Sequence, residues 1–238
     1  MKLLWQQISS PIITKILTSN TTLDGVVLDC EHGFFNKENL LNCINAKAKG
    51  KLVIVRLPEV SKSMISYCLD AGADGLIFAN IVSRKQSIKI LEYSLFPPLG
   101  KRGLGFSAHN DWGEKKKLGV HKKPLLIPQI ESSEAVEKIK EEDQTTLILN
   151  SSLCDPAFDY YLIGPYDLSL SLGSAGDYDS KEFKSAMKVL KQKIGEKKLG
   201  IHIPKNVKSN ISKFKNYGLK CLGMDTTSLI KYSQNPEV

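Results

Sequence analysis

The sequence contains little arginine, tryptophan or histidine for its length of 238 residues. Only three of its 33 basic residues are arginines, Arg56, Arg84 and Arg102. Nucleic-acid-binding surfaces usually depend on clustered arginine with interleaved aromatic residues. The net charge of +8 therefore indicates general surface charge, and we expect no nucleic-acid partner. The densest basic stretch, residues 115–123, contains no Phe, Tyr or Trp and is typical of a solvated loop.

Paired cysteine motifs and long apolar runs are also absent. The five cysteines are odd in number and show no CxxC spacing, which is typical of a reducing compartment rather than of a disulfide framework. No apolar run reaches the ~18 residues that a membrane span needs, and the apolar stretch at the start is too short for a signal peptide. We therefore expect a cytoplasmic protein that has no membrane partner.

What the chain does contain is a repeating pattern of short apolar runs and helical segments. The hydrophobic fraction of 42% and the charged fraction of 24% are those of a folded globular protein. Short runs rich in Val, Ile and Leu alternate with polar turns and helical spacing, which is typical of parallel strands joined by helices. Eight such units in a chain of this length predict an α/β protein, a (β/α)8 TIM barrel formed by residues 1–238 as a single domain.

The apolar runs give the expected strand positions. The predicted strands are Leu3–Gln7, Gly25–Cys30, Leu52–Arg56, Gly75–Ala79, Leu125–Ile130, Tyr160–Ile163, Leu199–Ile203 and Leu219–Met224. Helical spacing follows in Ser133–Ile139 and Lys181–Lys197. Thr145–Leu149 could form a ninth short strand, and Phe96–Lys123 is a long loop of the kind that is usually functional. A doubly wound open sheet is the alternative architecture, because it has the same local pattern.

Polar residues gather where the predicted strands end. The second strand ends in Asp29-Cys30-Glu31-His32-Gly33, the third in Arg56, the fifth in Gln129-Ile130-Glu131, and the sixth runs into Gly164-Pro165-Tyr166-Asp167. The carboxyl ends of barrel strands meet at one rim, where the active sites of such proteins lie. The sequence therefore predicts carboxylates, an imidazole and a guanidinium at one site.

Seven motifs follow one another along the chain, LDCEHG (28–33), IVRLP (54–58), CLDAGADG (68–75), FPPLGKRGLG (96–105), PQIES (128–132), IGPYDLSLSLG (163–173) and GMDTT (223–227). With these motifs in this order, the sequence resembles the HpcH/HpaI aldolases, which are metal-dependent pyruvate aldolases on a (β/α)8 barrel. The resemblance covers nearly the whole chain. It implies an aldehyde-lyase that cleaves or forms a 4-hydroxy-2-oxo acid, with pyruvate (or a similar 2-oxo acid) and an aldehyde as its small-molecule partners.

The resemblance also implies a role for each matching residue. Glu131 and Asp167 bind a divalent cation, for which hard carboxylate oxygens suit Mg²⁺ or Mn²⁺, with Co²⁺ as a further option. His32 is the acid–base group, and Arg56 binds the oxygens of pyruvate. Asp29 and Asp70 are supporting carboxylates. Gln129, Gly164 and Pro165 line the substrate pocket, and Arg102 fixes its own loop.

The chemistry of these residue types supports the same reading. Loss of a proton from the methyl group of pyruvate, or cleavage of the aldol, leaves an enolate whose charge a cation can stabilise. Arginine presents a fixed fork of donors to carboxylate oxygens. Histidine titrates near neutrality, so His32 can relay a proton through water, and a neighbouring carboxylate would fix its tautomer.

Three alternatives stay open. A lyase acting on acyl-CoA thioesters, as in the wider superfamily with citrate lyase subunits, would suit the basic surface. A Schiff-base aldolase would use Lys205, just past the seventh strand. A non-catalytic barrel that binds a metabolite or a partner protein is the third, because residues 106–112 lack the further arginine that relatives often carry.

The last predicted helix bears on the oligomeric state. The last helix is predicted from Thr227 to about Gln234, and in the resembling family this helix packs across a subunit interface. The resemblance therefore implies a homo-oligomer.

Overall fold

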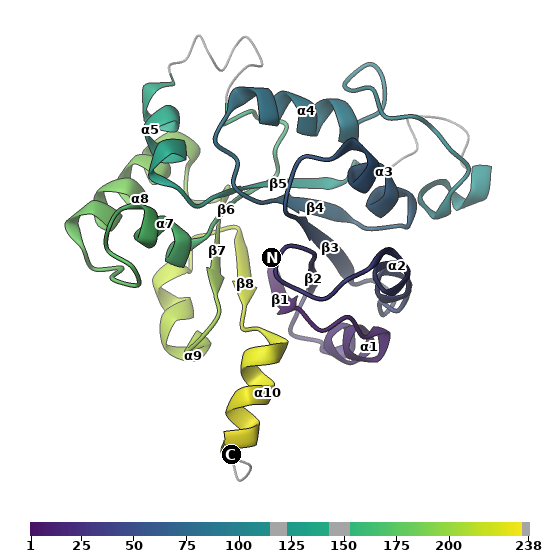
Figure 1. Cartoon of the computed structure of the whole chain (residues 1–238), viewed down its shortest axis with the longest axis horizontal. Coiled ribbons are helices and arrows are strands. Elements are labelled where there is room, and N and C mark those ends of the chain that lie inside the picture. The colour runs from purple at the N-terminus through teal and green to yellow at the C-terminus, as the bar shows by residue number, and fades with distance from the viewer. Residues whose placement is uncertain (115–122, 143–152, 235–238) are drawn as a thin grey trace.

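Eight parallel strands form a closed barrel in the computed structural model, which describes residues 1–114, 123–142 and 153–234 (Figure 1). Each strand pairs with the next along the chain, and β8 pairs with β1. The strands are β1 (Lys2–Gln6), β2 (Gly25–Asp29), β3 (Leu52–Leu57), β4 (Gly75–Phe78), β5 (Leu125–Ile130), β6 (Tyr161–Ile163), β7 (Leu199–Ile203) and β8 (Leu219–Leu222). The predicted (β/α)8 barrel is thereby confirmed, and the open sheet is excluded.

The strands are mostly apolar because both of their faces are buried. In β2, the side chain of Val27 packs inside the barrel, whereas Val26 and Leu28 pack in the layer between the barrel and the helices. The interior cluster of the barrel consists of Leu3, Trp5, Val27, Ile54, Ile77, Ile127, Leu162, Leu219 and Cys221. Toward the carboxyl ends of the strands, polar side chains replace this apolar cluster. The packed apolar interior therefore lies directly beneath the polar rim of the barrel.

Helices surround the barrel (Figure 1). The helices after the first five strands are α1 (Pro11–Ser19), α2 (Lys37–Asn45), α3 (Lys62–Asp70), α4 (Arg84–Ser94) and α5 (Ser133–Glu141). Those after the last three strands are α7 (Pro165–Ser171), α8 (Lys181–Ile194), α9 (Val207–Asn210) and α10 (Asp225–Gln234). Side chains of Ser or Asn cap the first turns of α1, α2, α4, α5 and α8. Such caps satisfy free backbone N–H groups and fix where each helix begins.

The helix α10 differs from the other long helices because it extends away from the barrel (Figure 1). It begins two residues before the predicted Thr227, and its one buried residue is Asp225. Leu229, Ile230 and Tyr232 are between 54% and 59% exposed. An apolar helix face of this kind is uncovered within one copy of the chain.

Two short 3-10 helices also lie within the described residues. The loop after α4 contains η1 (Ala108–Gly113), and η3 (Ile211–Phe214) directly follows α9. The ninth strand predicted at Thr145–Leu149 falls outside the described residues. Among the described residues, Cys30, Cys43, Cys68 and Cys221 are free thiols. Among the described residues, no helix is long and apolar enough to cross a membrane.

Candidate active site

Asp29, the last residue of β2, is the centre of a buried hydrogen-bond network. Its carboxylate is completely buried and accepts six hydrogen bonds. The donors are Trp5 Nε1, Gln7 Nε2, the backbone N–H groups of Glu31 and His32, and Nε and Nη2 of Arg56. Hydrogen bonds to a charged group stabilise its charged form. Burial raises the pKa of Asp29, but Arg56, Trp5 and the backbone of His32 outweigh it and lower this pKa to about 2.

Arg56 is held by two carboxylates. Asp29 and Arg56 are register partners on β2 and β3, so both side chains point into the same end of the barrel. Nε and Nη2 of Arg56 each lie 2.8 Å from an oxygen of Asp29, and Nη1 lies 2.5 Å from Oε2 of Glu31. The residue is 5% exposed. A bidentate pair of this kind fixes the plane of the guanidinium.

His32 stands above this pair and faces solvent. Its side chain is 64% exposed, and Nε2 lies 3.9 Å from Oε2 of Glu31. The carboxylate of Asp29 accepts a hydrogen bond from the backbone N–H of His32 and not from its ring. The carboxylate that lies beside the imidazole ring is therefore that of Glu31. Gly33 makes this turn compact, because a Cβ atom there would lie 2.2 Å from the carbonyl oxygen of Asp29.

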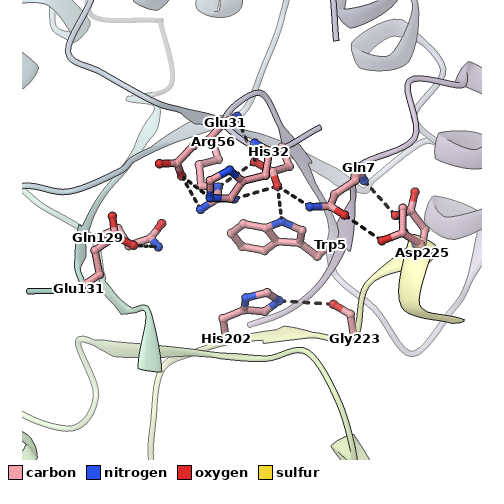
Figure 2. Close-up of polar contacts among 12 residues, drawn as sticks. Trp5, Gln7, Glu31, His32, Arg56, Gln129, Glu131, His202, Gly223 and Asp225 are labelled. Atoms are coloured by element: carbon pink, nitrogen blue, oxygen red, sulfur yellow. Dashed lines mark hydrogen bonds and ion pairs between the residues drawn. The ribbon is translucent and has the colours of Figure 1, made fainter. Parts of the chain in front are cut away.

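Glu131 follows β5 on another side of the rim (Figure 2). Its Oε1 accepts a hydrogen bond from the backbone N–H of Asn80 at 2.7 Å, and its Oε2 from Nε2 of Gln129 at 2.5 Å. Burial raises the pKa of Glu131 to about 7, and the charges of Glu31 and Asp167 add to this effect. Carboxylates that repel one another at one rim favour a bound cation.

The other predicted residues of this side come from the start of α7. Gly164 is close to both Gln129 and Glu131, because a Cβ atom there would lie 3.0 Å from Gln129 Nε2 and from Glu131 Oε2. Pro165 is the first residue of α7, and Asp167 is an exposed acid in the first turn of this helix. Two carboxylates with a close backbone approach fit a hard divalent cation. Among the described residues, no group of three or more His, Cys, Asp or Glu forms a complete metal site.

Asp70 does not join the other predicted residues. It is the last residue of α3, a helix that runs back from the carboxyl end of β3 toward the amino end of β4. It therefore lies at the opposite rim from Asp29 and Glu131. Its Oδ1 accepts a hydrogen bond from Nη2 of Arg102 at 2.6 Å. The guanidinium of Arg102 also lies over the ring of Phe96, at 4.8 Å from its centroid, so Arg102 ties its own loop to α3.

A cavity of about 970 Å³ lies between α8 and the segment formed by α9 and η3. It reaches the rim at Pro165 and Tyr166 and is lined in part by Lys205. Lys205 is exposed, whereas a Schiff-base lysine is activated by a low-dielectric pocket or a neighbouring cation.

Trp5, Gln7 and His202 also belong to the site, although they were not predicted from the sequence. Their positions in the strands could have indicated them. Trp5 and Gln7 are two residues apart and therefore lie on the same face of β1 and its extension, and His202 is the polar residue within apolar β7. Gln7 is held by the start of α10, where Asp225 Oδ1 accepts from its backbone N–H and Thr226 Oγ1 donates to its Oε1.

The chain is similar to one family of known proteins over nearly its whole length. The HpcH/HpaI aldolase/citrate lyase family matches residues 2–231. A 2-keto-3-deoxy-L-rhamnonate aldolase of Escherichia coli is 30% identical over 175 residues, which are 71% of this chain and 61% of that protein. A 4-hydroxy-4-methyl-2-oxoglutarate aldolase of Hapsidospora irregularis is 25% identical over 196 residues, which cover 77% and 67%. The match thus spans less than two thirds of the bacterial relative.

Solved structures show the same fold. A HpcH/HpaI aldolase/citrate lyase family protein from Burkholderia cenocepacia superimposes with a TM-score of 0.83 at 22% identity, over 99% of this chain and 92% of the other. A HpcH/HpaI aldolase from Desulfitobacterium hafniense gives a TM-score of 0.80 at 22% identity, over 99% and 90%.

Proposed function

Because the chain belongs to the HpcH/HpaI aldolase/citrate lyase family, we propose that it is a divalent-metal-dependent aldehyde-lyase. Its reaction is the cleavage or formation of a 4-hydroxy-2-oxo acid, with pyruvate or a similar 2-oxo acid and an aldehyde as partners. The observation that carries the proposal is that one rim contains two kinds of charged group. One half of the site has the guanidinium of Arg56, paired with Asp29 and suited to an anion, and the other half has Glu131, which interacts with the charge of Asp167 and is suited to a cation.

Glu131 and Asp167 are the residues proposed to hold the cation. Their oxygens suit Mg²⁺ or Mn²⁺, and Co²⁺ is a further option. When bound, the cation supplies stabilisation of the negative charge that develops on the oxygens of the 2-oxo acid. Gln129 and Gly164 support this half of the site, since one donates to Glu131 and the other leaves space beside it.

Arg56 is proposed to bind the carboxylate of the 2-oxo acid. Three of its five N–H bonds face Asp29 and Glu31, which leaves two for a ligand. The guanidinium is always charged, and its burial strengthens its attraction for an anion. Arg56 therefore orients the substrate with respect to Glu131.

His32 is proposed to move the proton. In the cleavage direction it accepts the proton of the 4-hydroxyl group, directly or through water. The C3–C4 bond then breaks, its electron pair remains on the 2-oxo acid as the enolate, and the aldehyde leaves. Return of a proton to C3 completes pyruvate. Glu31, 3.9 Å from Nε2 of His32, stabilises the protonated imidazole.

The same proposal includes a homo-oligomer in the cytoplasm. The uncovered apolar side chains of α10 are available to a second copy of the chain. Ile12 and Ile16 on α1 are also exposed, at 72% and 63%, and could receive such a helix. Free thiols at Cys30, Cys43, Cys68 and Cys221 agree with a reducing compartment.

Exchange of the methyl protons of pyruvate for deuterium tests this function without knowledge of the aldehyde. We expect metal-stripped protein to catalyse exchange only after Mg²⁺, Mn²⁺ or Co²⁺ is added, as measured by NMR. Glu131→Gln should lose both cation binding and exchange, whereas Glu134→Gln, which changes an exposed carboxylate of α5, should keep both. No exchange with any cation, from folded protein that binds the cation, would overturn the proposal.

A further inference from the structure

Trp5 lies between two groups in the barrel interior (Figure 2). Its indole stacks on the imidazole of His202, with ring centroids 4.3 Å apart and an interplanar angle of 19°. The guanidinium carbon of Arg56 lies 4.8 Å from the centroid of the indole. Figure 2 shows Arg56 on one side of the indole and His202 on the other. The three side chains form a column that begins in β7, passes through β1 and ends in β3.

The edge of the indole also contacts the partner of Arg56. Trp5 Nε1 donates a hydrogen bond to Oδ2 of Asp29 at 3.0 Å, and the same oxygen accepts from Nη2 of Arg56 at 2.8 Å. Trp5 is 1% exposed and Asp29 is completely buried. The fork of Asp29 fixes Arg56 within the guanidinium plane, and the indole face limits its movement out of that plane.

His202 completes the column from below. Its Nε2 lies 3.5 Å from the carbonyl oxygen of Gly223, the residue that follows β8. Burial lowers the pKa of His202 to about 4, and the charge of Arg56 contributes to this effect. The ring is therefore neutral at pH 7 and packs against Trp5 as an uncharged aromatic plate.

We propose that Trp5 and His202 are positioning residues, which hold the guanidinium of Arg56 in the orientation that binds the carboxylate of the 2-oxo acid. Neither residue touches the reacting atoms; each acts through Arg56 and Asp29. The role in catalysis rests on the proposed function, whereas the restraint on Arg56 can be measured without any reaction.

The first test observes Arg56 directly. The chain has three arginines, so protein labelled with ¹⁵N-arginine gives three Nε–H signals, which Arg56→Lys assigns. We expect the Nε–H of Arg56 to exchange with solvent slowly, and His202→Ala or Trp5→Phe to accelerate this exchange at least about tenfold. His202→Phe keeps a ring under the indole and should restore slow exchange. The Nε–H of Arg102, in its own loop, is the internal control.

The second test uses the reaction. Since Arg56 binds the carboxylate, His202→Ala should raise the KM for pyruvate about three- to tenfold in the exchange assay while kcat changes less than about twofold, and His202→Phe should return the KM to the wild-type value. Unchanged exchange of the Arg56 Nε–H in His202→Ala and Trp5→Phe would overturn the positioning role. Slow Nε–H exchange that these variants accelerate, in a wild-type protein inactive with every cation, would instead refute the proposed function and leave the restraint standing.

Discussion

Glu131→Gln should make the metal-free protein more stable at high pH. Burial and the charges of Glu31 and Asp167 raise the pKa of Glu131 from 4.5 to about 7. A carboxyl group whose pKa is raised in the folded state keeps its proton up to a higher pH than it does in the unfolded chain. The free energy of unfolding therefore falls as the pH rises from the unfolded pKa to the folded one, and glutamine has no such dependence.

The size of the effect follows from the two pKa values. The shift from 4.5 to about 7 corresponds to about 3 kcal/mol when the group is fully ionised, at ~1.4 kcal/mol per pH unit. At pH 5 most of this difference is absent, and less than about 1 kcal/mol is expected. The variant can also keep its hydrogen bonds, because Gln129 Oε1 is buried without a hydrogen-bond partner among the described residues and could accept from the new amide.

Urea unfolding of the two proteins in EDTA, at pH 5 and at pH 8, measures this difference. Titrating groups that do not interact with Glu131 are common to both proteins, so their contributions cancel in the comparison. Glu31 and Asp167 do interact with it, so the measured difference includes the relief of their repulsion. Glu134→Gln is the control, since it removes an exposed carboxylate that pairs with Lys138 and should change stability by less than about 0.5 kcal/mol at either pH.

Addition of the cation should remove most of the stability difference between the two proteins at pH 8. At a concentration one hundred times the dissociation constant, a bound cation stabilises the wild type by about 2.7 kcal/mol, and Glu131→Gln should gain nothing. If the difference between the two proteins is the same at pH 5 and pH 8, Glu131 is not raised in pKa. If the variant gains as much from the cation as the wild type, Glu131 is not a ligand.

Three further predictions concern the other parts of the site and the assembly. Arg56→Lys should raise the KM for pyruvate at least about tenfold in steady-state kinetics, because an ammonium group cannot form the bidentate pair; an unchanged KM would contradict the anion-binding role. Gly164→Ala should weaken cation binding in calorimetry, because its Cβ would lie 3.0 Å from Glu131 Oε2; wild-type affinity would show that the backbone approach is unimportant. Leu229→Asp and Ile230→Asp, on the exposed face of α10, should yield a smaller species in analytical ultracentrifugation; an unchanged sedimentation coefficient would exclude this face from the subunit interface.

The strand order and most strand ends could be predicted from sequence because the strands are buried on both faces. Leu125–Ile130 and Leu199–Ile203 were predicted at their observed bounds, since each is a mostly apolar run beside a turn, with one polar residue, Gln129 or His202. The residues of the rim could be predicted from the strand bounds, because the carboxyl ends of all strands lie at one end of the barrel. That reasoning brings Asp29, Arg56 and Glu131 together.

The same reasoning fails where contacts join distant strands or where a helix carries the residue. Asp70 precedes a strand instead of following one, so the direction of α3 places it at the opposite rim, beside Arg102. The stack of His202 on Trp5 joins β7 to β1 across the barrel interior. No spacing along the chain reveals this contact, because it depends on the tilt of the closed strands and on which interior side chains share a layer.

The two halves of the site leave the ribosome at different times. Trp5, Asp29 and Arg56 belong to β1, β2 and β3, so all three have been synthesised once the chain reaches Arg56. Glu131 and Asp167 are synthesised later, after β5 and β6. His202 and the pairing of β8 with β1 come last. A nascent chain therefore carries a charged pair and an indole face that stay uncovered until the last strands are made, and this half-built barrel is where chaperones would be needed most.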